Sequence, residues 1–383
     1  MAENTITGLV PEIFEALDIV SRELTGMIPS ATLNASANSA QVGQAIRVDV
    51  EPVGNVSNIT PAMVVPDPTG QTSGFTDIII TKSRAAEFGF NGEDQLGLNT
   101  GAGYGSVRAN KIAQAIRAVT NEVEADLCGL QSTFSRAVGT AGTTPFGTAN
   151  DYTDASKALQ VLKDNGSPLQ DNQLVINTNA GVNMLGKQAN VSDAGSDSIL
   201  RQGVLLDVNG MPIRESAQVN TVAAVGTSAN AVTTAGHAVG STSIVLKAAG
   251  TGTILAGDVI TFAGDTNQYV VVTGVGAVSG ATIVIAAPGL RQALPVGDKA
   301  ISIVAASARN MAFNRSAIVL AARAPARPVE GDMAADVIII TDPRSGLTME
   351  FSMYLGYKKV RYEVGLAWGV KNIKPEHTAL LLG

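Results

Sequence analysis

Residues 106–137 read SVRANKIAQAIRAVTNEVEADLCGLQSTFSRA and carry the strongest helical signal in the chain. Apolar side chains recur at spacings of three and four residues, the pattern of one face of an α-helix. They are Ala109, Ile112, Ile116, Val119, Val123, Leu127, Leu130 and Phe134. The other face carries Arg108, Lys111, Arg117, Glu124 and Arg136. We expect a helix about 45 Å long, at 1.5 Å per residue.

Three further residues of this helix carry groups that could do chemistry. Glu122 and Asp126 share one face and could form a carboxylate pair for acid–base catalysis. A solvated or salt-bridged helix face is the better interpretation of such spaced charges. Cys128 lies in the same alanine-rich pattern, so we expect a buried small hydrophobic residue and not a nucleophile.

The region before the helix, residues 43–90, predicts a long two-stranded excursion. Apolar and charged residues alternate in its outgoing strand, the pattern of a half-buried β-strand. The alternating residues are Ile46, Arg47, Val48, Asp49, Val50 and Glu51. Residues 75–81 supply the return strand. The loop between the strands is long and rich in proline, which is typical of functional or mobile segments.

The N-terminal segment predicts a short amphipathic helix over residues 11–25, with Pro11 at its first position. Its apolar face consists of Ile13, Phe14, Leu17, Val20 and Leu24. A helix this short is marginal alone in water, so we expect it to dock on the body or on a neighbouring chain. The segment lacks the basic start and unbroken apolar core of a signal peptide.

The rest of the chain mixes helical and strand patterns, which gives the fold class α+β. Residues 219–308 differ from their surroundings, because they contain few charges and short apolar runs separated by Gly and Asp. Regularly spaced short strands of this kind predict a small all-β barrel or sandwich, here inserted into the α+β body. Near the end, two alternating strands change phase around Gly356, where we expect a turn or bulge.

Composition excludes several classes of function. The chain has 383 residues, of which 15% are charged, and a formal net charge of −7. This argues against tight, sequence-independent binding of nucleic acid, which needs clustered Lys and Arg. One cysteine excludes a disulfide-stapled scaffold, and no apolar run approaches the ~20 residues of a membrane span. We expect a soluble protein with no catalytic residue, no metal site and no cofactor.

Short stretches distributed over nearly the whole chain add a resemblance to this picture. They are residues 8–11 (GLVP), 19–24 (IVSREL), 80–85 (ITKSRA), 90–93 (FNGE), 120–127 (TNEVEADL), 139–146 (GTAGTTPF), 213–217 (IRESA), 368–370 (WGV) and 375–376 (PE). In their order and spacing they resemble the major capsid (coat) proteins of tailed bacteriophages, of the short-tailed Salmonella-phage coat-protein type. The resemblance is weakest in the β region.

The resemblance implies the tailed-phage major capsid protein fold, with an N-terminal arm, an extended loop, a spine helix, and peripheral and axial domains. It divides the chain into an arm (1–42), an extended β-hairpin loop (43–90), a peripheral domain with the spine helix (91–149), an axial domain in two parts (150–218 and 309–345), an inserted β-barrel domain (219–308) and the C-terminal strands of the peripheral domain (346–383).

The same resemblance implies a structural protein and not an enzyme. Such a chain forms homo-oligomers, the hexamers and pentamers of an icosahedral capsid, with a scaffolding protein and a portal as partners. The shell encloses double-stranded DNA without sequence-specific binding and expands from a procapsid. Assembly takes place in the cytoplasm of the host bacterium, and the product is part of the virion.

We expect contacts between copies in the N-terminal helix, in the hairpin and just after it. The candidate interface residues are Pro11, Ile13, Phe14, Leu17, Val20, Leu24, Arg47, Asp49, Glu51, Lys82 and Arg84. The alternative is that they are ordinary exposed charges and a helix packed on its own body. Two other functions stay open: a carbohydrate- or receptor-binding virion module that uses Phe262 and Tyr269, and a hydrolase with a β accessory domain.

Overall fold

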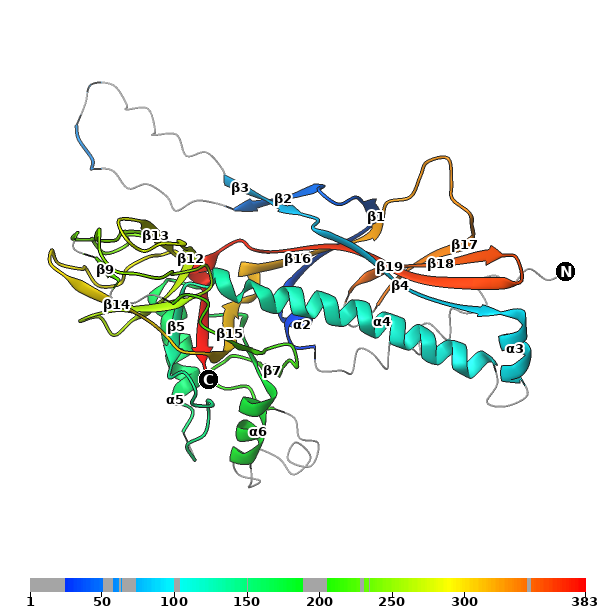
Figure 1. Ribbon diagram of the computed structural model, residues 1–383, viewed down its shortest axis with the longest axis horizontal. Helices are drawn as coiled ribbons and strands as arrows, with labels where there is room; N and C mark the ends of the chain where they lie inside the picture. Colours follow the sequence, from blue (N-terminus) through cyan, green and yellow to red (C-terminus); the bar gives the residue numbers. More distant parts are fainter. Residues whose placement is uncertain are drawn as a thin grey trace.

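The computed structural model shows an elongated molecule built from two large β-sheets and one long helix (Figure 1). Helices and strands alternate irregularly along the chain, so the predicted α+β class is confirmed. The structure describes residues 25–50, 58–61, 63, 74–99, 104–149, 151–188, 205–227, 231–233, 235–342 and 346–383. The predicted helix at residues 11–25 lies outside these residues except for Thr25.

The long helix α4 runs from Tyr104 to Gly129. Its predicted apolar face packs into the main hydrophobic core, where Ile116, Val123 and Leu127 are fully buried. The predicted end of the helix at residue 137 is wrong. Glycine is a poor helix former, and after Gly129 a 3-10 turn, Leu130–Thr133, redirects the chain into a strand.

The six-stranded sheet is organised around its longest strand, β19. One edge of β19 pairs with β4, while the other edge pairs first with β18 and then with β16. Parallel pairing of β1 with β16 and antiparallel pairing of β17 with β18 complete the sheet. The strands are β1 (Thr32–Ala40), β4 (Lys82–Asn91), β16 (Ile318–Pro325), β17 (Ala334–Thr341), β18 (Thr348–Gly356) and β19 (Lys359–Asn372).

The turn that the sequence predicts near Gly356 is present. β18 ends at Gly356 and β19 begins at Lys359, so two residues join the antiparallel strands. The second of them, Lys358, has a φ of 54°, in the left-handed region that tight hairpin turns require. The short helix α3 (Gly92–Asn99), which follows β4, lies at the same end of the molecule (Figure 1).

The second sheet forms the other end of the molecule and contains the second hydrophobic cluster. Its central strands are β6, β15, β20 and β5, and the helices α5 and α6 lie beside them (Figure 1). The elements are β5 (Arg136–Gly139), α5 (Thr153–Asp164), β6 (Asn172–Ile176), α6 (Thr178–Lys187), β7 (Ile213–Glu215), β8 (Thr221–Val222), β15 (Ser307–Asn314) and β20 (Thr378–Leu382).

Within residues 219–308 the described part of the chain forms strands and turns. The strands lie at the apolar runs of the sequence and enclose a hydrophobic cluster of their own. They are β9 (Val232–Thr233), β10 (Ser243–Val245), β11 (Val259–Phe262), β12 (Gln268–Thr273), β13 (Thr282–Ile285) and β14 (Lys299–Ile303). A two-residue pairing of β12 with β5 makes these strands a continuation of the second sheet, which has 12 strands in all among the described residues.

A separate ribbon consists of β2 (Ala45–Val50) and β3 (Gly74–Ile79), which pair with each other antiparallel. The predicted alternation is present in β2, where Ile46 and Val48 are half-buried and Arg47 and Asp49 are exposed. Figure 1 shows the ribbon outside both large sheets. Of the residues expected in the hairpin, 82–90 belong instead to β4 of the six-stranded sheet.

Candidate functional site

The outward face of the ribbon combines charges with uncovered apolar side chains. Arg47 Nε lies 3.3 Å from Asp77 Oδ1, and its guanidinium stacks 3.7 Å from the centre of the Phe75 ring. Phe75 is 56% exposed and Ile79 is 52% exposed. An exposed ion pair of this kind stabilises the ribbon by at most about 1 kcal/mol. Because Phe75 and Ile79 are half exposed, this face is available for other contacts.

The apolar side chains on the inward face of the ribbon pack against the body near its base. Ile78 and Ile80 are fully buried in a small cluster with residues of β16 and β19, and Ile46 and Val48 pack against that cluster. Farther along the connection, Ile59 is fully exposed. Glu51, another candidate interface residue, lies outside the described part of the chain, as do Pro11, Ile13, Phe14, Leu17, Val20 and Leu24.

Lys82 and Arg84, the other candidates, contact α4 of their own chain. Lys82 Nζ lies 3.0 Å from Glu122 Oε1 and 2.8 Å from Asp126 Oδ1, and Arg84 Nε lies 3.5 Å from Glu122 Oε1. Trp368 Nε1 donates to the other Asp126 oxygen at 2.8 Å. The hydrogen bond to Asp126 raises the pKa of Lys82. The predicted salt-bridged helix face is therefore confirmed, and it ties β4 and β19 to the helix.

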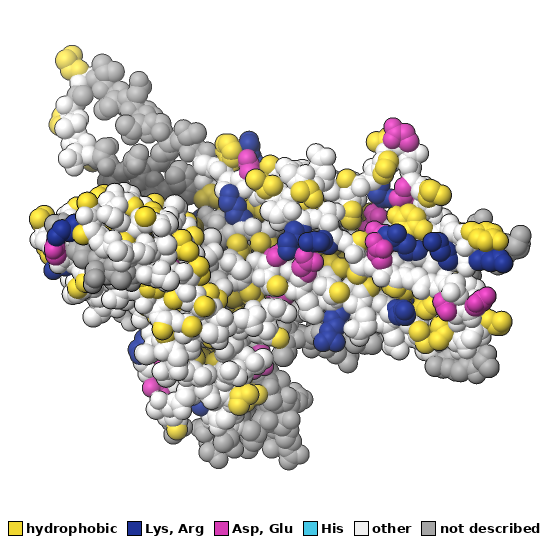
Figure 2. Space-filling model, viewed as in Figure 1, with side chains coloured by type: hydrophobic (Ala, Val, Ile, Leu, Met, Phe, Trp, Pro, Cys, Tyr) yellow, Lys and Arg dark blue, Asp and Glu magenta, His cyan; other side chains and the backbone are white. Residues whose placement is uncertain are grey.

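Figure 2 shows positive and negative side chains side by side over this part of the body, whereas the region of β9–β14 carries few charges. Mixed charges at short range leave no extended basic surface there.

Glu124 corrects the sequence prediction, which places it on the polar face of α4. Its carboxylate is fully buried and accepts hydrogen bonds from the backbone N–H groups of Met27 (2.7 Å) and Ile28 (3.0 Å), at the start of α2 (Met27–Ser30). Burial raises its pKa. These bonds fix α2 to the C-terminal part of the long helix, five residues before its end at Gly129. The spacing of four residues offers a signal in the sequence, because it places Glu124 on the same helix face as Thr120 and Cys128. Both of these residues are buried.

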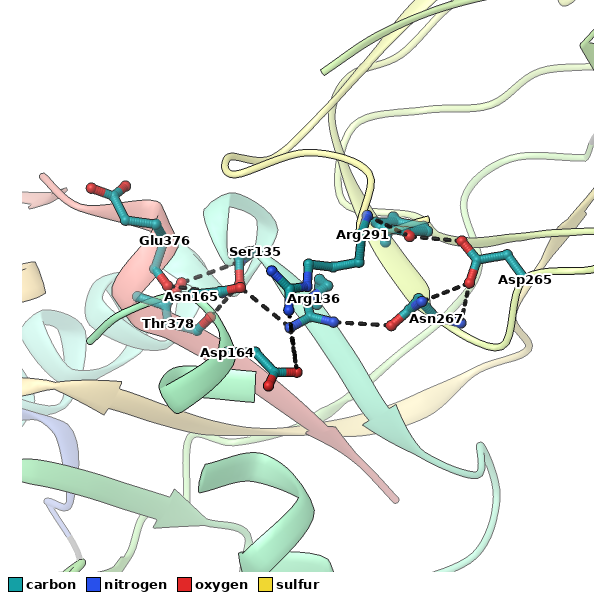
Figure 3. A network of polar contacts seen from close by, with 10 residues as sticks. Ser135, Arg136, Asp164, Asn165, Asp265, Asn267, Arg291, Glu376 and Thr378 are labelled. Carbon is teal, nitrogen blue, oxygen red and sulfur yellow. Dashed lines mark hydrogen bonds and ion pairs between the residues drawn. The ribbon is translucent and has the colours of Figure 1, made fainter. Parts of the chain in front are cut away.

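Arg136 is also buried, contrary to its predicted place on the exposed face, because the helix ends before it. Its guanidinium donates to Asn267 Oδ1 at 2.9 Å, Asn165 Oδ1 at 3.2 Å and Asp164 Oδ2 at 3.4 Å (Figure 3). Burial lowers its pKa. One side chain on β5 thus joins the end of α5 to the loop before β12.

The network continues on both sides of Arg136 (Figure 3). On one side, Asn165 Nδ2 donates to Ser135 Oγ at 3.1 Å and to the Glu376 carbonyl at 2.9 Å. On the other, Asn267 donates to Asp265, which also accepts a 2.7 Å bond from the Tyr269 hydroxyl. The polar groups of this network therefore hold together segments that lie far apart in the sequence.

The far end of the molecule carries a second exposed apolar surface. An open groove of about 840 Å³ lies between the start of α3 and the β18–β19 turn, lined among others by Phe90 and Tyr357. Tyr357 and Leu355 project into solvent there, as does Leu96 of α3. Apolar side chains gathered at one end of a chain often mark a contact with another protein.

The residues that the alternative functions need are arranged unfavourably for them. Phe262 and Tyr269 are buried in the cluster of the β region, so neither can stack on a sugar. Cys128 is buried, and burial raises the pKa of its thiol to about 12. Among the described residues, no group of three His, Cys, Asp or Glu side chains could hold a metal ion. No helix in that part of the chain has the length and apolar character to span a membrane.

No protein-family model matches the chain, and no curated protein matches it significantly. Several solved structures match the chain. The cyanophage A-1(L) capsid asymmetric unit is 10% identical, with 93% of this chain and 92% of that one covered and a TM-score of 0.49. A virus-like particle from Pyrococcus furiosus is 10% identical (97% and 99% covered, TM-score 0.45). A Mycobacterium phage Che8 chain is 14% identical (88% and 84% covered, TM-score 0.44).

Proposed function

We propose that this chain is a shell-building subunit, the major capsid protein of a tailed bacteriophage, which polymerises into an icosahedral capsid. The observation that carries the proposal is the β2–β3 ribbon, a two-stranded sheet that lies outside the body with exposed Phe75 and Ile79 on its outward face. The finer assignment, to the short-tailed Salmonella-phage coat-protein type, rests on the sequence stretches quoted above.

The physical reason is that an isolated two-stranded ribbon is marginally stable in water and presents open edges. A neighbouring copy can cover its apolar face and pair with its edge, as an added strand does in other protein complexes. Each contact of this kind is weak, but a closed shell repeats it many times, and linked weak contacts hold together strongly. The apolar surface around Tyr357 at the other end gives each copy a second place to meet a neighbour.

We also propose the domain organisation that the resemblance implies. Residues 1–42 act as an arm, 43–90 as an extended loop, and 91–149 with 346–383 as a peripheral domain. Residues 150–218 and 309–345 form an axial domain, and 219–308 form an inserted β domain. Copies assemble as hexamers and pentamers in the bacterial cytoplasm with a scaffolding protein and a portal. The shell encloses double-stranded DNA and expands into the capsid of the virion.

The test is electron microscopy and size-exclusion chromatography of the overexpressed full chain, with and without a scaffolding protein. We expect capsomers or closed particles. Ile79→Asp adds a charge to the outward face of the ribbon and should block closure while leaving the subunit folded. Leu169→Asp changes an exposed apolar residue elsewhere and serves as the control. A folded monomer at high concentration that never forms particles would refute the proposal, and a melting shift with added sugar would favour the binding module.

A further inference from the structure

The direction in which the ribbon leaves the body is set by contacts with β19 beyond the hydrophobic base. Lys371 Nζ donates to Thr76 Oγ1 and to the carbonyl oxygen of Asp77, both at 2.9 Å. Thr76 lies on the same face of β3 as the buried Ile78, so the ammonium group reaches the inward face of the ribbon. Hydrogen bonds from a charged donor are about twice as strong as neutral ones.

A second contact lies two residues earlier on β19. At Gly369, a Cβ atom would lie only 2.1 Å from the carbonyl oxygen of Ile79, so the backbones of β3 and β19 cross in close contact at this point. The amide of Thr81 continues the crossing by donating to the Trp368 carbonyl at 3.0 Å. The crossing fixes one point of the ribbon, and Lys371 fixes a second point farther along β3. Two points define a direction.

We propose that Lys371 is a positioning residue that holds the ribbon at the angle at which it meets a neighbouring copy. This inference rests on the proposed function and adds a residue to it. Six residues of strand span about 20 Å, so a tilt of about 10° at the base moves the far end of β2 by roughly 3–4 Å. Packed contacts between apolar groups are largely lost over gaps of this size. A ribbon without the second fixed point would therefore meet its neighbour in many orientations.

The variant Lys371→Met tests the proposal, because it keeps the aliphatic stem and removes both hydrogen bonds. We expect amide hydrogen exchange in residues 45–50 and 74–79 to become at least about tenfold faster, which corresponds to a loss of about 1.4 kcal/mol. The yield of closed particles in electron micrographs should fall in parallel. Lys371→Arg supplies donors again and should restore both readings. Lys157→Met, an exposed lysine on α5, is the matched control and should change neither.

Thr76→Val removes one acceptor without changing the shape of the side chain, and it should give a smaller change in the same direction. Unchanged exchange in the ribbon of Lys371→Met would overturn the proposed fixed point. Faster exchange with an unchanged yield of particles would overturn the role in assembly. If the wild-type chain forms no particles, the proposed function fails, whereas the exchange measurement still decides whether Lys371 holds the ribbon.

Discussion

Replacing Arg136 by methionine should destabilise the junction between the second sheet and the β9–β14 region. The 2.9 Å hydrogen bond to Asn267 joins a buried charge to a side chain of the β region, and breaking such a bond costs about 1.5–3 kcal/mol. The bonds to Asn165 and Asp164 are longer, and Asp164 is 35% exposed, so together they add only about 1 kcal/mol. Removing a buried charge recovers part of its desolvation cost. We expect a net loss of about 2–3 kcal/mol.

Urea unfolding followed by circular dichroism measures the loss, and Trp368, the single tryptophan and fully buried, reports separately on the six-stranded sheet by fluorescence. Amide exchange in β12 shows whether the junction loosens first. Arg291→Met is the matched control, because Arg291 approaches the same Asp164 at 4.0 Å from a partly exposed position. It should cost less than about 1 kcal/mol. Equal losses in the two variants would refute the role assigned to the buried network.

Three further changes have defined outcomes. Lys82→Met should lower the free energy of unfolding by about 1 kcal/mol. Because hydrogen bonding raises the pKa of Lys82, the stability that it contributes is complete below the ordinary lysine pKa and is lost as pH rises through the raised value. Urea titrations at alkaline pH would detect this loss. Cys128, with a thiol pKa of about 12, should react with a thiol reagent at neutral pH only as fast as the chain opens, and rapid labelling of the folded chain would contradict its burial. Gly369→Ala should cost about 1–3 kcal/mol, because β3 must move away from the new methyl group; an unchanged melting temperature would exclude the close crossing.

Features that depend on neighbours in sequence could be predicted. The apolar stripe of α4 follows from its spacing, and the half-buried Ile46 and Val48 follow from strict alternation. The turn after Gly356 follows from a change of phase, since a strand must keep one face on the core. These patterns are local, so a single sequence contains them completely.

Features that depend on distant partners could not be predicted. Glu124 is buried because the backbone of Met27, 97 residues away, needs an acceptor, and Arg136 is buried because Asn267, 131 residues away, supplies one. Charge alone favours an exposed position for both residues. Lys371 lies still farther from its partner Thr76, 295 residues away in sequence. The close approach of Gly369 to Ile79 is a contact of the same kind, so the sequence alone could not predict the base of the ribbon.

The central place of β19 has a consequence for how the protein is made. This strand pairs with β4, for example Trp368 with Lys82, and with β18 and β16, yet the ribosome delivers it after all three. Until β19 emerges from the ribosome, the edges of β4 and β16 that pair with it lack their hydrogen-bonding partner. The apolar face of α4 also lacks the strand at the centre of the sheet that covers it. Contacts so distant in sequence form slowly, and unpaired edges in that interval favour aggregation. We therefore expect chaperones that bind unpaired strands to raise the yield of folded chain in any cell that translates it in quantity.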